Sequence, residues 1–137
     1  MKRKIFLFAV AVLLLQANLV AQFLQVSDNQ RFLVTSEGEP FFWLGDTGWE
    51  MLHRLGRQEM EHSLRDRAGK GFTVIQTVIV SERDGLTLPN REGPLPLVDF
   101  DPGAPVEDYL VLVDYAIAKA EEMGLVLALL PTWGRYV

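Results

Sequence analysis

The stretch "FTVIQTVIV", Phe72–Val80, decides the fold class. It is rich in β-branched residues and almost wholly apolar, which is typical of a central parallel strand that is covered on both faces. Two further apolar runs, "FFWL" (Phe41–Leu44) and "LVLALL" (Leu125–Leu130), lack polar alternation in the same way. The sequence therefore predicts three strands, each of them buried on both faces.

Helical patterns separate these three strands. Met60, Leu64 and Ala68 recur at every fourth position and predict a helix over Arg57–Ala68 with one apolar face. Pro105 suits the first position of a second helix, because proline lacks the N–H that a first turn leaves unpaired. The buried stripe predicted for this second helix consists of Tyr109, Val113, Ala116, Ile117, Ala120 and Met123.

The order strand, helix, strand, helix, strand indicates an α/β protein built from right-handed βαβ units. Two architectures fit this order: the N-terminal part of a (β/α)8 TIM barrel, and an open doubly wound sheet. Neither G-x-G-x-x-G nor a P-loop follows any predicted strand, which argues against a nucleotide-binding fold. A barrel needs about 200 residues or more, so we expect this 137-residue chain to be the N-terminal portion of a barrel, truncated after its third strand.

Three local features complete the predicted organisation. Residues 24–34 indicate a short β-hairpin around a turn at residues 28–30, and "TSEGEP" (Thr35–Pro40) indicates a second turn. Thr47 and Glu50 have the spacing of a capping box, which predicts a short helix over residues 48–54. Residues 81–104 contain four prolines and three glycines and are predicted to form a long functional loop.

The N-terminus has the pattern of a secretory signal peptide. Three basic residues precede the apolar run Ile5–Leu15, and this run is shorter than the ~20 residues of a membrane span. We expect cleavage after Ala21, so that residues 1–21 are the signal and residues 22–137 are a secreted or periplasmic domain. A retained membrane anchor is the alternative.

Composition excludes several classes of function. The chain contains no cysteine, which excludes disulfides and a lipid-anchored lipobox. Its net charge is −5, and loss of the basic signal would make the mature chain more acidic. We therefore expect no nucleic-acid partner, and no membrane partner once the signal is removed. His53 and His62 form no metal motif, and we expect neither a metal nor another cofactor.

Acidic, amide and indole side chains follow the three predicted strands. Because parallel strands end at one rim, residues that follow different strands become neighbours there. Carboxylates and amides bind sugar hydroxyls, and an aromatic plane covers the apolar face of a sugar ring. The sequence therefore predicts a carbohydrate site. Its expected substrate-binding residues are Asp46, Trp49, Glu82, Asp84, Asn90 and Trp133.

Each of these residues also has a structural interpretation. Asp46 could cap the helix that follows it, although Thr47 already suits that role and would leave Asp46 free. Both tryptophans could belong to the core, and Asn90 could make a turn. The two acids of the loop, Glu82 and Asp84, could be solvated charges that pair with Arg83 or Arg91.

A combination of motifs resembles the apiosidase-like glycoside hydrolases, a family of secreted bacterial TIM-barrel proteins that often carry a C-terminal domain once labelled collagen-binding. The motifs are "LGDTGW", "KGFTVIQ", "DGL" and "LPTWG", in this order and spacing, and the resemblance extends over nearly all of residues 23–137. It implies hydrolysis of a glycosidic bond in a plant cell-wall polysaccharide, most simply a pectic one.

The resemblance also places the catalytic carboxyl pair on later strands, beyond Val137. A pair made by Asp46 and Asp84 is the alternative within the chain. A non-catalytic carbohydrate-binding remnant of the same barrel and a purely structural secreted domain are two other functions that the sequence allows.

Overall fold

The computed structural model describes residues 24–134. These residues belong to two compact units that divide between Phe41 and Phe42. Within residues 24–134, every helix is too short or too polar to cross a membrane. The predicted signal peptide and its cleavage site lie outside the described residues.

The first unit is a small antiparallel sheet. Strands β1 (Gln25–Val26) and β2 (Leu33–Val34) form the predicted hairpin, and β3 (Pro40–Phe41) pairs with the other side of β2. The hydroxyl oxygen of Ser27 accepts a hydrogen bond from the backbone N–H of Phe32 and so closes the first turn. The predicted hairpin is confirmed, and β3 adds a third strand to it.

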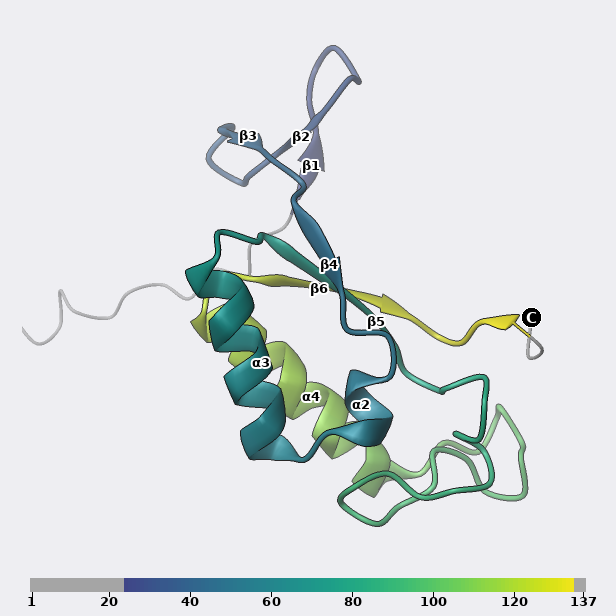
Figure 1. Cartoon of the computed structure of the whole chain (residues 1–137). Coiled ribbons are helices and arrows are strands. Elements are labelled where there is room, and N and C mark those ends of the chain that lie inside the picture. Colours follow the sequence, from purple (N-terminus) through teal and green to yellow (C-terminus); the bar gives the residue numbers. More distant parts are fainter. Residues whose placement is uncertain (1–23, 135–137) are drawn as a thin grey trace, which may run out of the picture. The chain divides into compact units, whose positions relative to one another are not determined.

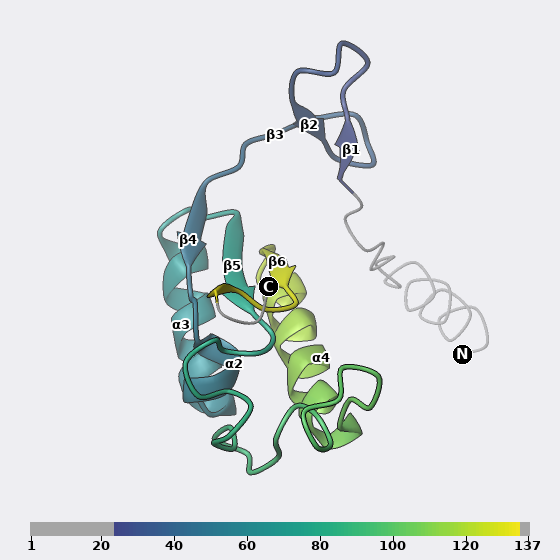
Figure 2. The same cartoon turned by 90° about the vertical axis from the view of Figure 1, so that its right-hand side faces the viewer.

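The second unit contains a parallel sheet with strand order β4-β5-β6, as shown in Figures 1 and 2. The strands are β4 (Gly45–Thr47), β5 (Val74–Val78) and β6 (Val126–Leu130). A short helix, α2 (Met51–Arg54), and a longer one, α3 (Arg57–Gly69), connect β4 to β5. Helix α4 (Glu107–Glu122) precedes β6. The predicted βαβ order is confirmed, and each strand lies beside its neighbour in sequence.

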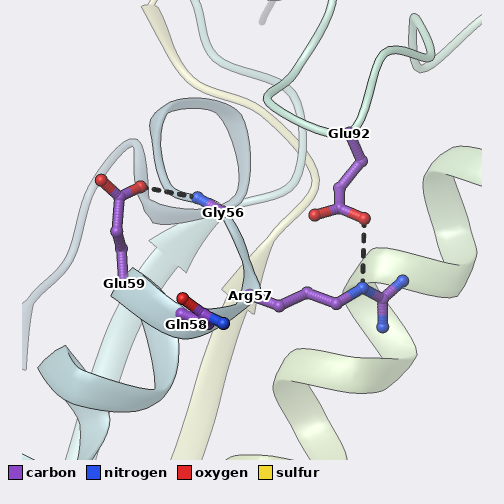
Figure 3. Close-up of a pocket in the computed structure, with 5 residues that line it drawn as sticks. All are labelled: Gly56, Arg57, Gln58, Glu59 and Glu92. Carbon is purple, nitrogen blue, oxygen red and sulfur yellow. Dashed lines mark hydrogen bonds and ion pairs between the residues drawn. The ribbon is translucent and has the colours of Figure 1, made fainter.

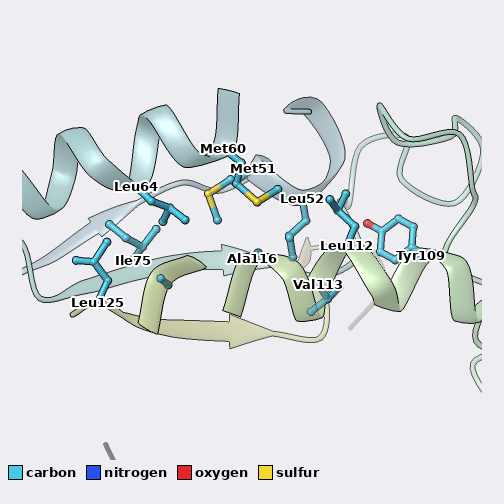
Figure 4. Packing of buried hydrophobic residues seen from close by; sticks show 11 residues of the cluster. Met51, Leu52, Met60, Leu64, Ile75, Tyr109, Leu112, Val113, Ala116 and Leu125 are labelled. Atoms are coloured by element: carbon cyan, nitrogen blue, oxygen red, sulfur yellow. The ribbon is translucent and has the colours of Figure 1, made fainter. Parts of the chain in front are cut away.

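The apolar core lies between one face of this sheet and the helices α3 and α4 (Figure 4). Ile75 of β5 faces this core, and its register partners on the neighbouring strands are Asp46 and Leu127. In a parallel sheet, register partners point to the same face. The side chains of Asp46 and Leu127 are therefore directed toward the helices.

The predicted position of the first strand is wrong. Phe41 belongs to β3, and the strand of the parallel sheet begins only at Gly45. Phe42 and Trp43 are 75% and 51% exposed. The prediction that all three strands are buried on both faces holds for β5 alone among the described strands, because β4 and β6 are the outer strands of this sheet.

The predicted helix starts and faces also need correction. Thr47 and Glu50 form no capping box, because Glu50 is itself the N-cap of α2 and its carboxylate binds other side chains. Helix α4 begins at Glu107 rather than at Pro105. Ile117, predicted to be buried, is 40% exposed.

Candidate functional site

Three of the predicted site residues come together beyond the carboxyl ends of the parallel strands. Trp49 follows β4, Glu82 follows β5 and Trp133 follows β6. Both carboxylate oxygens of Glu82 accept a hydrogen bond from the indole Nε1–H of Trp49, at 3.0 and 3.2 Å. The predicted convergence is therefore observed for these three residues, and their contact with a substrate stays a prediction.

The two indoles form an edge-to-face pair. Their ring centroids are 5.9 Å apart and their planes meet at 83°. Trp133 is 54% exposed, whereas Trp49 is half-buried. One indole is thus held in place by Glu82 and supports a second indole whose surface faces solvent. We call Trp49, Glu82 and Trp133 the indole platform.

Backbone hydrogen bonds hold the segments that carry this platform. The carbonyl of Trp49 accepts bonds from the N–H of Val78 and the hydroxyl of Thr77. The hydroxyl of Thr132 donates to the carbonyl of Val80 at 3.1 Å. These bonds join the segments that carry Trp49 and Trp133 to β5 and to the residues directly after it.

Asp46 does not lie past a strand, and the prediction that it is left free is wrong. It belongs to β4, and its carboxylate is bound by Arg67 of α3 and by the backbone N–H of Thr47. These contacts, the hydrogen bond from Arg67 above all, hold the pKa of Asp46 below its ordinary value. Asp46 therefore connects the sheet to α3, which is a structural task.

Asp84 lies two residues after Glu82 and is bound by helix α2. Its Oδ1 accepts a hydrogen bond from Arg54 at 2.8 Å and lies 3.2 Å from Nε2 of His53. Burial alone would raise the pKa of Asp84, but the bond and charge of Arg54 and the nearness of His53 keep it below its ordinary value. An arginine does bind this acid, but the observed partner is Arg54 of α2, which the sequence did not suggest.

Asn90 makes a turn, as its structural interpretation allowed. Its side-chain oxygen accepts hydrogen bonds from the backbone N–H groups of Glu92 and Gly93, each at 3.0 Å. The side chain is buried, and its amide nitrogen has no hydrogen-bond partner among the described residues. A direct role of Asn90 in substrate binding stays a prediction.

Two hollows lie near this part of the molecule. The first, shown in Figure 3, is lined by Gly56, Arg57, Gln58, Glu59 and Glu92. Its charges are already paired: Glu59 accepts a bond from the Gly56 N–H at 2.9 Å, and Arg57 donates to Glu92 at 3.1 Å. The second is mostly apolar, has a volume of about 590 Å³, and includes Phe100 and Tyr109 in its lining.

The chemistry of the indole platform suits a hydroxylated ligand with apolar C–H faces. Glu82 offers acceptors for hydroxyl groups, and Trp133 offers an exposed aromatic surface. Within residues 24–134, no three histidine, cysteine, aspartate or glutamate side chains are grouped so that they could hold a metal ion. The arrangement can bind and orient a sugar.

Sequence reasoning missed the residues that bind the predicted acids. Arg67 lies 21 residues from Asp46, and Arg54 lies 30 residues from Asp84. The sequence predicts that these arginines lie on helices, but it does not predict which carboxylate each of them binds. Which carboxylate each one meets depends on how α2 and α3 pack on the sheet.

The parallel sheet and its helices are part of a (β/α)8 barrel, and the indole platform lies at the rim where the active sites of such barrels are found. The chain belongs to the apiosidase-like family: the profile of the apiosidase-like catalytic domain matches residues 27–137. The resemblance seen in the sequence is thereby confirmed.

Solved structures support the same fold and class. A structure described as a glycoside hydrolase is 34% identical, with a TM-score of 0.69 over 81% of this chain and 25% of its own. A glycoside hydrolase family 5 protein from Bacteroides vulgatus is 30% identical, with a TM-score of 0.69 over 83% of this chain and 25% of its own.

A third neighbour supports the fold alone. It is a family 5 mannosidase from Rhizomucor miehei, 17% identical, with a TM-score of 0.61 over 79% of this chain and 27% of its own. The chain thus spans about a quarter of the length of the solved structures that it matches. No curated protein sequence matches it.

Proposed function

We propose that this chain is part of a glycoside hydrolase that acts on plant cell-wall polysaccharide, in particular on a pectic one. The family supports the reaction class, and the resemblance seen in the sequence supports the substrate. In this proposal the indole platform binds and orients the sugar. The anomeric carbon loses its bond to the leaving oxygen and gains one to the oxygen of water, and the leaving oxygen takes up a proton.

The indole platform is the observation that carries the proposal. Trp133 presents an indole surface that is 54% exposed, and it packs at 5.9 Å against an indole that Glu82 holds in place. A rigid aromatic surface beside a carboxylate is what a sugar ring needs, because it has apolar faces and a polar edge. The platform lies beyond the carboxyl ends of the strands, where the active sites of barrel enzymes are found.

Neither Asp46 nor Asp84 is suited to be the general acid of the reaction. Glycoside hydrolysis needs two carboxyl groups, about 5–5.5 Å or about 6.5–9.5 Å apart, and the acid of the pair must have a raised pKa. The hydrogen bond from Arg67 lowers the pKa of Asp46, and the pKa of Asp84 is also held below its ordinary value. We therefore do not assign the catalytic pair to Asp46 and Asp84, and we assign substrate positioning to the indole platform.

Isothermal titration of the full-length protein with rhamnogalacturonan-II oligosaccharides tests the platform. Trp133→Ala should weaken binding about tenfold, because an aromatic contact is worth about 0.5–1.5 kcal/mol beyond the area it buries. Trp43→Ala is the matched control, since Trp43 is 51% exposed but precedes β4, whereas Trp133 follows β6. Equal affinities of the two variants would contradict the proposal.

Product analysis separates the enzyme from its alternative, the carbohydrate-binding remnant. The proposal expects release of reducing sugar from the pectic oligosaccharide by the full-length protein. Binding with the affinity pattern described above, but with no release of sugar after long incubation, would favour the remnant.

We also propose that the protein is exported after removal of residues 1–21. The basic residues and the short apolar run at the N-terminus support this proposal. Mass spectrometry of the N-terminal peptide of the mature protein should find Gln22 as the first residue. An uncleaved Met1 on the exported protein would contradict it.

A further inference from the structure

The loop that carries Glu82 is attached to one short helical turn at two points. Ser81 precedes Glu82, and its hydroxyl donates to Oε1 of Glu50 at 2.5 Å. Asp84 follows Glu82 and accepts a hydrogen bond from Arg54 at 2.8 Å. Glu50 and Arg54 belong to the turn that begins directly after Trp49, so both attachments lead back to the residue that Glu82 itself binds.

The first attachment point is buried and closely packed. Ser81 is fully buried, and the hydrogen bond from its hydroxyl is the main cause that holds the pKa of Glu50 below its ordinary value. Gly85 packs against the backbone of Ser81 so tightly that a Cβ at this position would lie 2.6 Å from the Ser81 carbonyl oxygen. The turn from Ser81 to Gly85 is therefore closely packed, and the buried Ser81 hydroxyl is its attachment to Glu50.

The second attachment point includes a buried histidine. His53 is 4% exposed, and its Nε2 lies 3.2 Å from the same oxygen of Asp84 that Arg54 binds. Its other ring nitrogen, Nδ1, is buried and has no hydrogen-bond partner among the described residues. A buried N–H without an acceptor is costly, which favours the tautomer with the proton on Nε2, facing Asp84.

We propose that Glu50, Arg54, His53, Ser81 and Asp84 are positioning residues that hold Glu82 against the Trp49 indole and so keep the indole platform in its binding geometry. We call this set the loop anchor. It touches no sugar in this proposal, and it acts through Glu82. The inference about substrate affinity rests on the proposed function, whereas the inference about the Trp49 indole does not.

The first readout needs no sugar. In the full-length protein, the NMR signal of the Trp49 indole N–H, assigned with Trp49→Phe, should show the shift and the slow exchange of a proton bonded to a carboxylate. The double variant Arg54→Ala with Ser81→Ala should move this signal toward that of an exposed indole and speed its exchange at least about tenfold. Arg65→Ala is the matched control, because Arg65 lies on α3 and is 72% exposed at its side chain.

The second readout is affinity for rhamnogalacturonan-II oligosaccharides. A misplaced positioning group can cost up to about 100-fold, and we expect the double variant to bind about tenfold more weakly with an unchanged number of sites. Arg54→Lys, which keeps a donor to Asp84, should restore part of the affinity and of the indole signal. A merely structural role would lower the melting temperature without this parallel recovery.

Two outcomes judge the proposals separately. An unchanged Trp49 indole signal in the folded double variant would overturn the loop anchor, whatever the sugar affinity. If the indole signal changes in the double variant but the wild-type protein binds no pectic oligosaccharide, the loop anchor is supported and the proposed function is refuted. If the double variant fails to fold, Arg54→Ala alone decides, because the Arg54 side chain is 44% exposed and its loss leaves the core intact.

Discussion

Tyr109 makes the stability of this protein sensitive to alkaline pH. Its ring is 1% exposed in the core beneath the loop that leads to Glu82, and its hydroxyl donates to the carbonyl of Ile79 at 2.5 Å. Burial raises the pKa of Tyr109 to about 12, because the phenolate would lose its hydration. In an unfolded chain the same hydroxyl has a pKa of about 10.

The sign of the effect follows from these two pKa values. Below pH 10 the hydroxyl is protonated in the folded and in the unfolded state, so the stabilisation that depends on this proton is fully present. Between about pH 10 and pH 12 the unfolded state loses its proton first, so unfolding becomes easier. The loss amounts to about 1 kcal/mol at pH 11 and to about 3 kcal/mol over the whole window, at about 1.4 kcal/mol for each pKa unit.

Urea unfolding of the wild type and of Tyr109→Phe at pH 8 and pH 11 measures this loss. At pH 8 the variant should be less stable by about 1–3 kcal/mol, because the carbonyl of Ile79 loses its donor in a partly buried place. At pH 11 the gap between the two proteins should be smaller by about 1 kcal/mol, since only the wild type has Tyr109 to ionise. A gap of constant size would refute the argument that Tyr109 resists ionisation.

Four further substitutions test the packing and the ion pair of Asp46. Gly85→Ala should lower the free energy of unfolding in urea by about 1–3 kcal/mol, because the new Cβ would lie 2.6 Å from a backbone oxygen. Gly69→Ala on α3 should raise this free energy by about 0.5–1 kcal/mol, because no atom lies within 4 Å of the new Cβ. Leu64→Ala, at a site 1% exposed in the core, should cost about 2–5 kcal/mol. Asp46→Asn should lower the free energy of unfolding by less than about 1 kcal/mol, because the ion pair of Asp46 with Arg67 is about one-third exposed. The affinity for pectic oligosaccharides should stay unchanged. A tenfold loss of affinity would show that Asp46 takes part in binding.

The order of strands and helices could be predicted because each pattern is local. The recurrence of Met60 and Leu64 marked one face of α3, and both are buried there. The run around Ile75 marked the central strand. The error lay in the run Phe41–Leu44, where four consecutive apolar residues fit a strand at any register. The strand of the parallel sheet in fact begins at Gly45, directly after this run.

The meeting of Trp49, Glu82 and Trp133 could also be predicted, since it follows from topology. Parallel strands with adjacent order must end side by side, and the segments that follow them must be neighbours. The partners of the charged side chains could not be predicted in the same way. Arg54 and Arg67 reach their carboxylates across the contact between helix and sheet, and that contact depends on three-dimensional packing.

The shift of the first strand along the chain changes what Asp46 can do. If the strand ended at Leu44, Asp46 would stand past its tip and could face a ligand. The observed strand includes Asp46 in register with Ile75, whose side chain is in the helix-facing core. Because register partners in a parallel sheet point to the same face, Asp46 faces the helices, and its carboxylate binds Arg67 there. Glu82, by contrast, lies beyond β5 and binds the Trp49 indole at the rim, whereas Asp46 connects β4 to α3.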